Sequence, residues 1–268
     1  MRTFVMGDIH GAYKAFVQCL ERSGFNPQTD QLIQLGDIVD GYPQVYEVME
    51  HLLSIPDKIL IKGNHDDWLE RYMATGIHPS SWSHGGEATM ISYLQHAGKP
   101  NQIIRTFSGF KNNMTPTDIP QTHKKLLASQ HLYYKDAAGR LFVHGGFNRK
   151  LRLTDQHPTD FFWDRNLLST ALEIKSALGE DTPPEDFYEQ SDISAVFIGH
   201  TPTTHLGRRL ATDTPVQALN ILDLDTGAGH HGRLTVLELT ADPGGSELSR
   251  YPYWQSDPVG TLYDRSYR

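Results

Sequence analysis

Short apolar runs alternate with segments of helical periodicity in the first third of the chain. The predicted strands are residues 4–6, 32–35 and 59–61, and the predicted helices are residues 13–24, 45–53 and a segment from about 66 onward. Between the first two strands, apolar residues recur at the spacing of one helix face, and Gly24 closes the segment. Regular alternation of strand and helix predicts an α/β fold with a largely parallel, buried sheet.

The middle of the chain loses this alternation. Residues from about 68 to 130 show helical stretches broken by glycine and proline and contain no predicted strand, so we expect a helical insertion beside the sheet. The later pattern predicts a hairpin, a helix and further strands, at residues 132–134 with 141–143, at 163–178, and at 195–198, 216–224 and 234–239. These strands favour a second sheet, antiparallel or mixed.

No repeat or long linker divides the sequence, so residues 1–268 are expected to form a single domain. A C-terminal tail from about 242 to 268 is both aromatic and polar. It either packs along the second sheet or forms a contact between subunits. The oligomeric state does not follow from the sequence.

Composition narrows the classes of function. With 38% hydrophobic residues the chain can bury a sizeable core, and 24 basic against 32 acidic side chains give a net charge of −8, which disfavours binding of a nucleic-acid duplex. Cys19 is the single cysteine, so a metal must be held by oxygen and nitrogen. Apolar runs are too short for a signal peptide or a membrane span, which favours a cytoplasmic protein.

The candidate functional residues lie where apolar, strand-like runs end. Five times such a run is followed by a glycine next to side chains that can bind metals. The segments are Gly7-Asp8-Ile9-His10-Gly11, Gly36-Asp37-Ile38-Val39-Asp40, Gly63-Asn64-His65-Asp66, His144-Gly145-Gly146 and Gly199-His200-Thr201. In open α/β sheets, ligands bind beyond the carboxyl ends of the strands, so these segments are expected to converge.

The spacing within these segments suits a centre of two metal ions. Asp8 and His10 lie on the same side of an extended backbone and can bind one ion. The two oxygens of Asp37 can bridge two ions, and a second site would be completed by Asn64, His144 and His200. Pairs of ions about 3.5–4 Å apart are a recurrent device for displacement at phosphate esters.

Other histidines carry weaker signals. His84 is expected in a loop that lines the cleft, with a structural role equally open, whereas His230 and His231, in a Gly-rich turn after Asp225, are not expected to have a role near the site. Seven more stand in helical or loop segments without partners and are expected to be solvated or packed: His51, His78, His96, His123, His131, His157 and His205.

Taken in order, these five segments resemble the calcineurin-like metallophosphoesterases. The similarity is strongest to the phosphoprotein phosphatase branch, which includes bacterial and phage serine/threonine phosphatases and the symmetrical diadenosine tetraphosphatases. The resemblance implies a four-layer αββα sandwich of two mixed β-sheets flanked by helices. It places Asp8, His10 and Asp37 on the first metal, and the second metal on Asp37, Asn64, His144 and His200.

The resemblance also implies roles outside the metal ligands. His65 is expected to be the general acid, with Asp40 orienting it. Arg165, together with Asn64, is expected to bind the substrate phosphate. Two divalent ions are implied, with Mn²⁺ favoured and Fe, Zn²⁺ or Mg²⁺ as alternatives. They would share the hydroxide that attacks phosphorus directly.

Two positions depart from the family pattern. The family usually continues the second segment with Arg-Gly, and that arginine clamps the phosphate, whereas this chain has Gly41 followed by Tyr42. Either phosphate binding is weaker, or another cation reaches the site; the candidates are Lys62, Arg71 and Arg105. The smaller departure is Lys62 itself, which stands where arginine often precedes Gly-Asn-His.

The expected function is therefore hydrolysis of phosphate monoesters, on a phosphopeptide or a small aryl or alkyl phosphate. A dinucleoside polyphosphate hydrolase or phosphodiesterase using the same metals is one alternative. A catalytically weak binding scaffold is an alternative of another class. Five aromatic side chains of the insertion could stack on a base or a phenyl ring, although aromatic residues in helical segments are more often core: Trp82, His84, Tyr93, Phe107 and Phe110.

Overall fold

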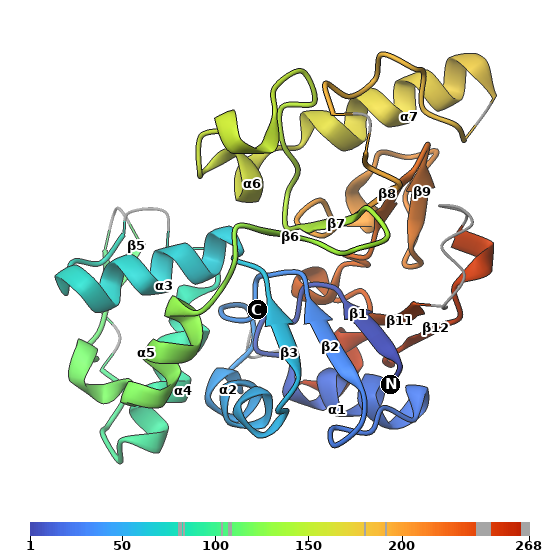
Figure 1. The fold of residues 1–268 in the computed structure, drawn as a ribbon. Coiled ribbons are helices and arrows are strands. Elements are labelled where there is room, and N and C mark those ends of the chain that lie inside the picture. Colours follow the sequence, from blue (N-terminus) through green and yellow to red (C-terminus); the bar gives the residue numbers. More distant parts are fainter. Residues whose placement is uncertain are drawn as a thin grey trace.

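A computed structural model describes the chain at residues 1–79, 82, 84–102, 104–106, 109–179, 181–190, 192–239 and 248–263. Two five-stranded sheets pack face to face between layers of helices (Figure 1). This confirms the predicted four-layer αββα arrangement. Within the described residues, no helix is long and apolar enough to cross a membrane.

The first sheet has the order β12-β11-β1-β2-β3. Its strands are β1 (Thr3–Met6), β2 (Gln31–Gln34), β3 (Lys58–Leu60), β11 (Thr235–Leu239) and β12 (Tyr253–Gln255). The first three are parallel, whereas β11 runs antiparallel to β1 and β12 antiparallel to β11. Along β1, side chains alternate between the helix layer, which receives Phe4 and Met6, and the core between the two sheets, which receives Val5.

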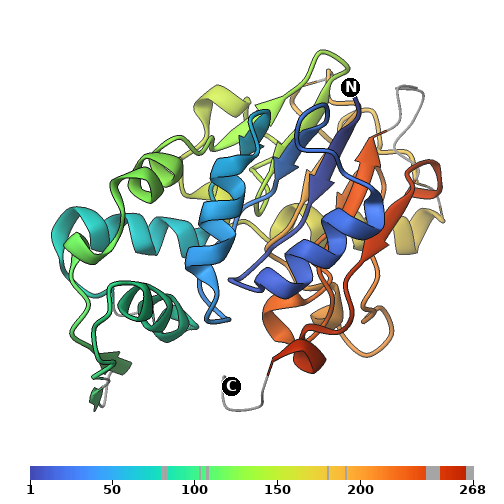
Figure 2. The ribbon, with the colours of Figure 1, turned by 90° about the horizontal axis from the view of Figure 1, so that it is seen from below.

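Helices α1 (Tyr13–Ser23) and α2 (Val45–Ser54) cover the outer face of this sheet, as Figure 2 shows from below. Gly24 ends α1 with a left-handed φ of 63°, and its N–H bonds back to the last turn, as predicted. The buried faces of both helices join the strands in one apolar cluster. The predicted βαβ alternation is thus confirmed.

The second sheet has the order β6-β7-β8-β10-β9. Its strands are β6 (Tyr133–Lys135), β7 (Arg140–Val143), β8 (Ala195–Ile198), β9 (Val216–Ala218) and β10 (Ile221–Asp223). Strands β7, β8 and β10 are parallel, and the edge strands β6 and β9 are antiparallel to their neighbours. Helices α6 (Asp160–Trp163) and α7 (Asn166–Leu178) cover its outer face.

Three expectations about the later elements differ from the structure. The strand expected at residues 234–239 is β11, which joins the first sheet rather than the second, because it pairs with the otherwise open edge of β1. In the tail, β12 pairs with β11, so this described segment lies on the first sheet. The strand expected at 216–224 is a hairpin, in which Leu219 turns the chain with a φ of 53°.

Residues 64–128 form a body of helices at one side of the sheets (Figures 1 and 2). It contains α3 (Asn64–Thr75), α4 (Gly86–His96) and α5 (Gln121–Ala128). This region was expected to contain no strand, but β4 (Ile104–Thr106) and β5 (Gly109–Lys111) pair antiparallel within it. These three-residue strands are too short for periodicity to reveal.

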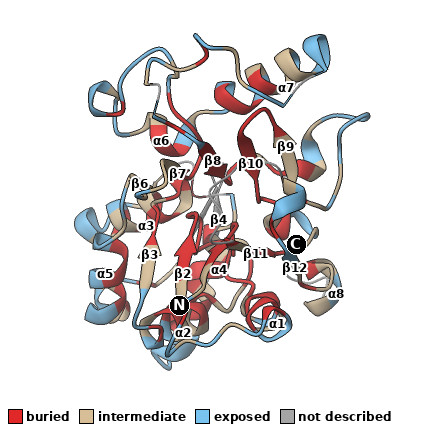
Figure 3. Cartoon of the chain, turned by 45° about the vertical axis from the view of Figure 1, so that its right-hand side comes forward, coloured by how far each residue is buried: buried red, intermediate tan, exposed pale blue. Residues whose placement is uncertain are grey.

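The remaining elements are short. A last helix, α8 (Val259–Leu262), lies in the tail. The 3-10 turns are Pro116–Asp118, Leu153–Asp155, Thr203–His205, Ala228–His230 and Leu248–Arg250. Figure 3 shows that buried residues run through both sheets, while the outward faces of the helices are exposed.

Candidate metal centre

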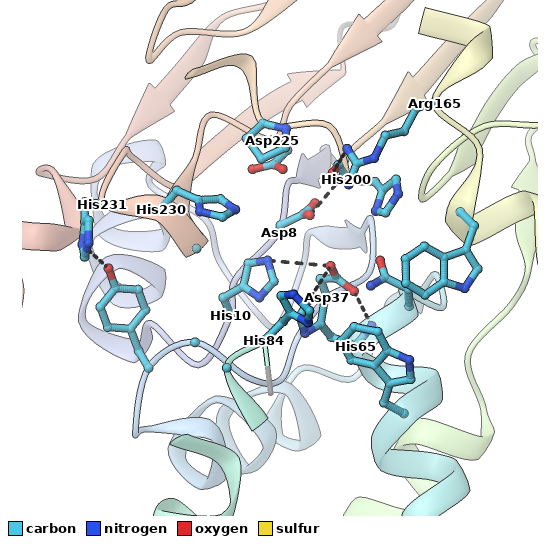
Figure 4. Close-up of a pocket in the computed structure, with 18 residues that line it drawn as sticks. Asp8, His10, Asp37, His65, His84, Arg165, His200, Asp225, His230 and His231 are labelled. Carbon is cyan, nitrogen blue, oxygen red and sulfur yellow. Dashed lines mark hydrogen bonds and ion pairs between the residues drawn. The ribbon is translucent and has the colours of Figure 1, made fainter. Parts of the chain in front are cut away.

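The five predicted segments follow β1, β2, β3, β7 and β8. Four of them, together with the loop after β10, line a cavity of about 620 Å³ (Figure 4). The expected site residues that line this cavity are Asp8, His10, Asp37, Asn64, His65, Arg165 and His200. His144 is fully buried behind them, with its Nε2 3.2 Å from Asn64 Oδ1.

Asp37 stands at the centre of this arrangement. Its Oδ2 lies 3.7 Å from Nε2 of His10, 3.9 Å from Nε2 of His65 and 3.4 Å from Nε2 of His144. Two groups of possible ligand atoms, each within 4.8 Å of one another, share this carboxylate: His10, Asp37 and His65, and Asp37, His144 and His200. A carboxylate shared by two clusters is the arrangement that a bridging ligand requires.

Two buried polar atoms at the site have no protein partner. They are Oδ1 of Asp8 and Nε2 of His200. Their residues are neighbours, because the backbone N–H of His200 donates to Asp8 Oδ2 at 3.1 Å. Leaving a buried polar atom unsatisfied costs about 1–3 kcal/mol, so both atoms fit the role of ligands to a cation. The set of oxygen and nitrogen donors fits divalent metal ions.

His144 shows how the fold presents a ligand atom. Its Nδ1 donates to the carbonyl of Leu35 at 2.7 Å, and a carbonyl can only accept, so Nδ1 carries the proton. In the neutral ring the lone pair is then on Nε2, which faces Asp37 and Asn64. A backbone carbonyl that fixes the tautomer in this way is typical of metal-binding histidines.

Close approach explains the glycines in two segments. A Cβ on Gly63 would lie 2.1 Å from Asp37 Oδ1, and a Cβ on Gly199 would lie 2.0 Å from Asp8 Oδ1. Any side chain at either position would displace a carboxylate of the site. These two glycines are therefore needed to bring the carboxylates against the neighbouring loops.

The electrostatics favour neutral rings at His10 and His200 and an ionised Asp37. Burial opposes ionisation of Asp37, but His144, His65 and His10 outweigh it and hold its pKa well below the usual range. Burial lowers the pKa of His10 to about 3 and that of His200 to about 2. Both rings consequently keep a free lone pair. Burial and the neighbouring Asp225 and Asp37 raise the pKa of Asp8.

His65 differs from the other imidazoles. Its Nδ1 lies 2.8 Å from Oδ2 of the fully buried Asp40. Burial opposes the charged form of the ring, but Asp37 and Asp40 together raise the pKa of His65 to about 9. The ring can therefore hold a proton at the cavity wall near neutral pH.

Arg165 also reaches the cavity. Its Nη1 donates to the carbonyl of His200 at 2.6 Å and to Thr201 Oγ1 at 3.0 Å. The single helix expected at 163–178 is interrupted just before Arg165. Asp164 Oδ1 accepts the N–H of Leu167, which is in the first turn of α7, so a new helix begins there. This break places the guanidinium beside His200, one of the candidate metal ligands.

The described residues place no second clamp cation beside Gly41. Lys62 pairs with Glu70, and Arg71 pairs with Asp67 at 2.7 Å, while the Arg105 side chain lies outside the described residues. Among the described residues that line the cavity, Arg165 is the single arginine or lysine. The imidazoles of His84, His230 and His231 line other parts of the cavity wall (Figure 4). His230 and His231 therefore lie at the site, which the sequence did not predict.

Of the five aromatic residues considered for stacking, only His84 is seen at the cavity. Trp82 and Tyr93 are fully buried in the core, whereas Phe107 and the Phe110 side chain lie outside the described residues. Two tryptophans that the sequence did not single out, Trp68 and Trp163, form an aromatic part of the wall, with ring centroids 5.6 Å apart.

Two carboxylates were also missed. Oδ1 of Asp66 accepts the N–H of Ile38 at 2.9 Å, and its Oδ2 accepts the N–H of Gly63 at 3.1 Å, so this residue ties two of the site loops together. Its place in the first turn of α3 is also that of an ordinary helix cap. Asp225 lines the cavity from the loop after β10. In the sequence, its position in a polar turn was the only feature that pointed to a role at the site.

Comparison with known proteins identifies the family of this chain. Residues 1–204 match the family model for calcineurin-like phosphoesterase, so the chain belongs to that family. Members of this family use a dimetal centre to act on phosphate esters. All five predicted segments lie within the matched residues.

Individual relatives share shorter stretches or the fold alone. Over 67 residues the chain is 42% identical to the symmetrical bis(5'-nucleosyl)-tetraphosphatase of Buchnera aphidicola and 40% identical to that of Erwinia tasmaniensis. These matches cover 25% of this chain and 24% of each relative, so they span about a quarter of the relatives' length.

Solved structures show the fold over nearly the whole chain. A candidate diadenosine tetraphosphatase superposes with a TM-score of 0.59 at 18% identity, covering 95% of this chain and 93% of that one. A protein serine/threonine phosphatase from Saccharomyces cerevisiae gives a TM-score of 0.56 at 12% identity, covering 96% of this chain and 80% of that one.

Proposed function

We propose that this protein is a metal-dependent phosphatase that hydrolyses phosphate monoesters, on phosphopeptides or small aryl and alkyl phosphates. The observation that carries the proposal is the buried Asp37 carboxylate, which two clusters of histidine side chains share. Membership of the calcineurin-like phosphoesterase family supports it.

In this proposal Asp8, His10 and Asp37 hold the first ion, and the second ion is bound by Asp37, Asn64, His144 and His200. We propose Mn²⁺ for both sites, although Fe, Zn²⁺ and Mg²⁺ also suit oxygen and nitrogen donors. When bound, two such ions activate a water for attack on phosphorus and neutralise charge on the phosphate oxygens.

The other site residues bind the substrate and move a proton. Arg165 faces the cavity and donates charge-assisted hydrogen bonds to the phosphate, with the Asn64 amide beside it. His65 gives its Nε2 proton to the departing oxygen, and Asp40 holds the ring by its other nitrogen. Because the ring is charged near neutral pH, the proton is available when the ester bond breaks.

A second candidate function is hydrolysis of dinucleoside polyphosphates by the same residues. Two observations favour it: the local similarity to symmetrical bis(5'-nucleosyl)-tetraphosphatases, and a cavity of about 620 Å³ with an aromatic wall at Trp68 and Trp163. This wall offers a surface on which a base can stack.

A substrate panel with added Mn²⁺ decides between these functions. It contains phosphoserine and phosphotyrosine peptides, p-nitrophenyl phosphate, a nucleoside monophosphate, diadenosine tetraphosphate and a phosphodiester. We expect the highest kcat/KM on a monoester. Preference for diadenosine tetraphosphate would establish the second function instead. A metal-loaded protein that turns over none of them would contradict both and leave the binding scaffold.

A further inference from the structure

Asp40 has more partners than the His65 ring. Its carboxylate also receives the indole N–H of Trp82, whose Nε1 is 3.0 Å from each oxygen. The hydroxyl of Thr89 lies 2.5 Å from Oδ1 of Asp40, and the same hydroxyl accepts the backbone N–H of Asp40 at 2.9 Å. Both partners belong to the helical insertion rather than to the loops that follow the strands.

These contacts fix the direction of each proton. An indole N–H can only donate, and the Thr89 hydroxyl, which accepts the backbone N–H, has one proton left to give to Oδ1. The Asp40 carboxylate accepts a hydrogen bond from each of these two donors, so it also acts as the acceptor in its bond with His65. The proton in its bond with His65 must therefore be on Nδ1, which leaves Nε2 facing the cavity.

Packing keeps these donors in place. Trp82 is fully buried, with its ring centroid 5.0 Å from that of Tyr72. A Cβ on Gly86 would lie 2.2 Å from the indole, so the ring fills the space beside the start of α4. The N–H of Gly41 donates to the carbonyl of Gly85 at 3.1 Å, which ties the insertion to the loop that carries Asp40.

We propose that Trp82 and Thr89 are positioning residues for the general acid, and that through them the insertion sets the proton-donating geometry of the site. This inference rests on the proposed function. In that reaction the oxygen of water forms a new P–O bond as the bond to the leaving group breaks. The electron pair stays on the leaving oxygen, which takes the Nε2 proton of His65. The ring is left neutral, with its proton on Nδ1 and hydrogen-bonded to Asp40, and the proton released by water goes to solvent, from which His65 is reprotonated.

Two variants test the positioning role. Trp82→Phe keeps a buried ring but removes the N–H, and Thr89→Val keeps the shape but removes the hydroxyl. We expect each to lower kcat on an alkyl phosphate about tenfold relative to kcat on p-nitrophenyl phosphate, because a p-nitrophenolate leaves with little acid help. The readout is the ratio of the two kcat values, measured with each variant fully loaded with metal.

Two matched variants serve as controls. Tyr93→Phe removes a buried hydroxyl from the same insertion, but one that contacts His123 rather than Asp40. Thr89→Ser restores the hydroxyl. Both are expected to keep the ratio within about twofold of the unaltered protein, since neither removes a donor to Asp40.

Nitrogen-15 NMR of the Zn²⁺-loaded protein gives a readout independent of turnover. The His65 signals are assigned by their loss in His65→Asn. We expect a protected Nδ1 proton in the unaltered protein and in both controls, and faster exchange of that proton in Trp82→Phe and Thr89→Val.

The outcomes separate this inference from the proposed function. Equal loss on both substrates with an unchanged Nδ1 proton would overturn the positioning role and leave Trp82 and Thr89 as support for the fold. If Trp82→Phe does not fold, the comparison of Thr89→Val with Thr89→Ser decides alone. Absence of turnover in the unaltered, metal-loaded protein would refute the proposed function, while the NMR result would still decide where the His65 proton is held.

Discussion

At the scale of single residues, the site is held in unfavourable backbone conformations. His10, Asp37, Asp40 and His200 all have left-handed φ values, between 51° and 70°. Such a conformation costs a residue with a Cβ about 1–2 kcal/mol. Four of these residues in one site indicate that the surrounding loops fix the side chains against local preference, as is common where geometry serves function.

The role of His65 leads to the first prediction. His65→Asn removes the proton donor, so kcat on an alkyl phosphate should fall about 100-fold or more, and on p-nitrophenyl phosphate much less. Steady-state rates on both esters measure this. His157→Asn, which changes an exposed loop histidine outside the cavity, is the control and should leave both rates unchanged. Equal losses on the two esters would contradict the acid role.

At the scale of elements, the sequence pattern predicted what depends on local periodicity and missed what depends on pairing. Strands β1, β2 and β3 and their connecting helices follow from apolar spacing, because each element buries one regular face. Which sheet β11 joins is decided by the open edge of β1, a long-range choice that spacing does not encode.

The contact between α4 and Trp82 gives an element-scale prediction. Gly86→Ala places a methyl group 2.2 Å from the indole and should lower the free energy of unfolding by about 1–3 kcal/mol through overpacking. Gly98→Ala, just after the same helix, meets open space and should cost about 1 kcal/mol from its left-handed φ alone. Denaturant titration measures the free energy of unfolding of the two variants. Equal losses of this free energy would contradict overpacking and show that the indole moves aside freely.

At the scale of the whole molecule, both sheets and the insertion contribute to one site. Five short segments spread over nearly two hundred residues could be recognised from the sequence, because each pairs a glycine with a ligand-type side chain at a strand end. Asp66, Asp225 and the Trp82 contact could not, because their importance comes from which distant loops the fold brings beside them.

Metal binding should stabilise the whole fold. The site buries carboxylates that repel one another, and an ion that binds only the folded state adds about 2.7 kcal/mol at a concentration of 100 Kd. For a chain of this size we expect Mn²⁺ to raise Tm by about 5–10 °C and a chelator to reverse it. Thermal unfolding with and without Mn²⁺ measures the shift; an unchanged Tm would argue against a buried metal site.

The number of ions bound per folded chain tests the central claim most directly. Equilibrium dialysis against Mn²⁺, followed by elemental analysis, should give two ions per chain in the unaltered protein. In Asp37→Asn, which weakens the bridging ligand, the count should fall well below two while the circular dichroism spectrum stays native. One ion or none in the unaltered protein, or two ions retained without the Asp37 carboxylate, would contradict the bridged pair.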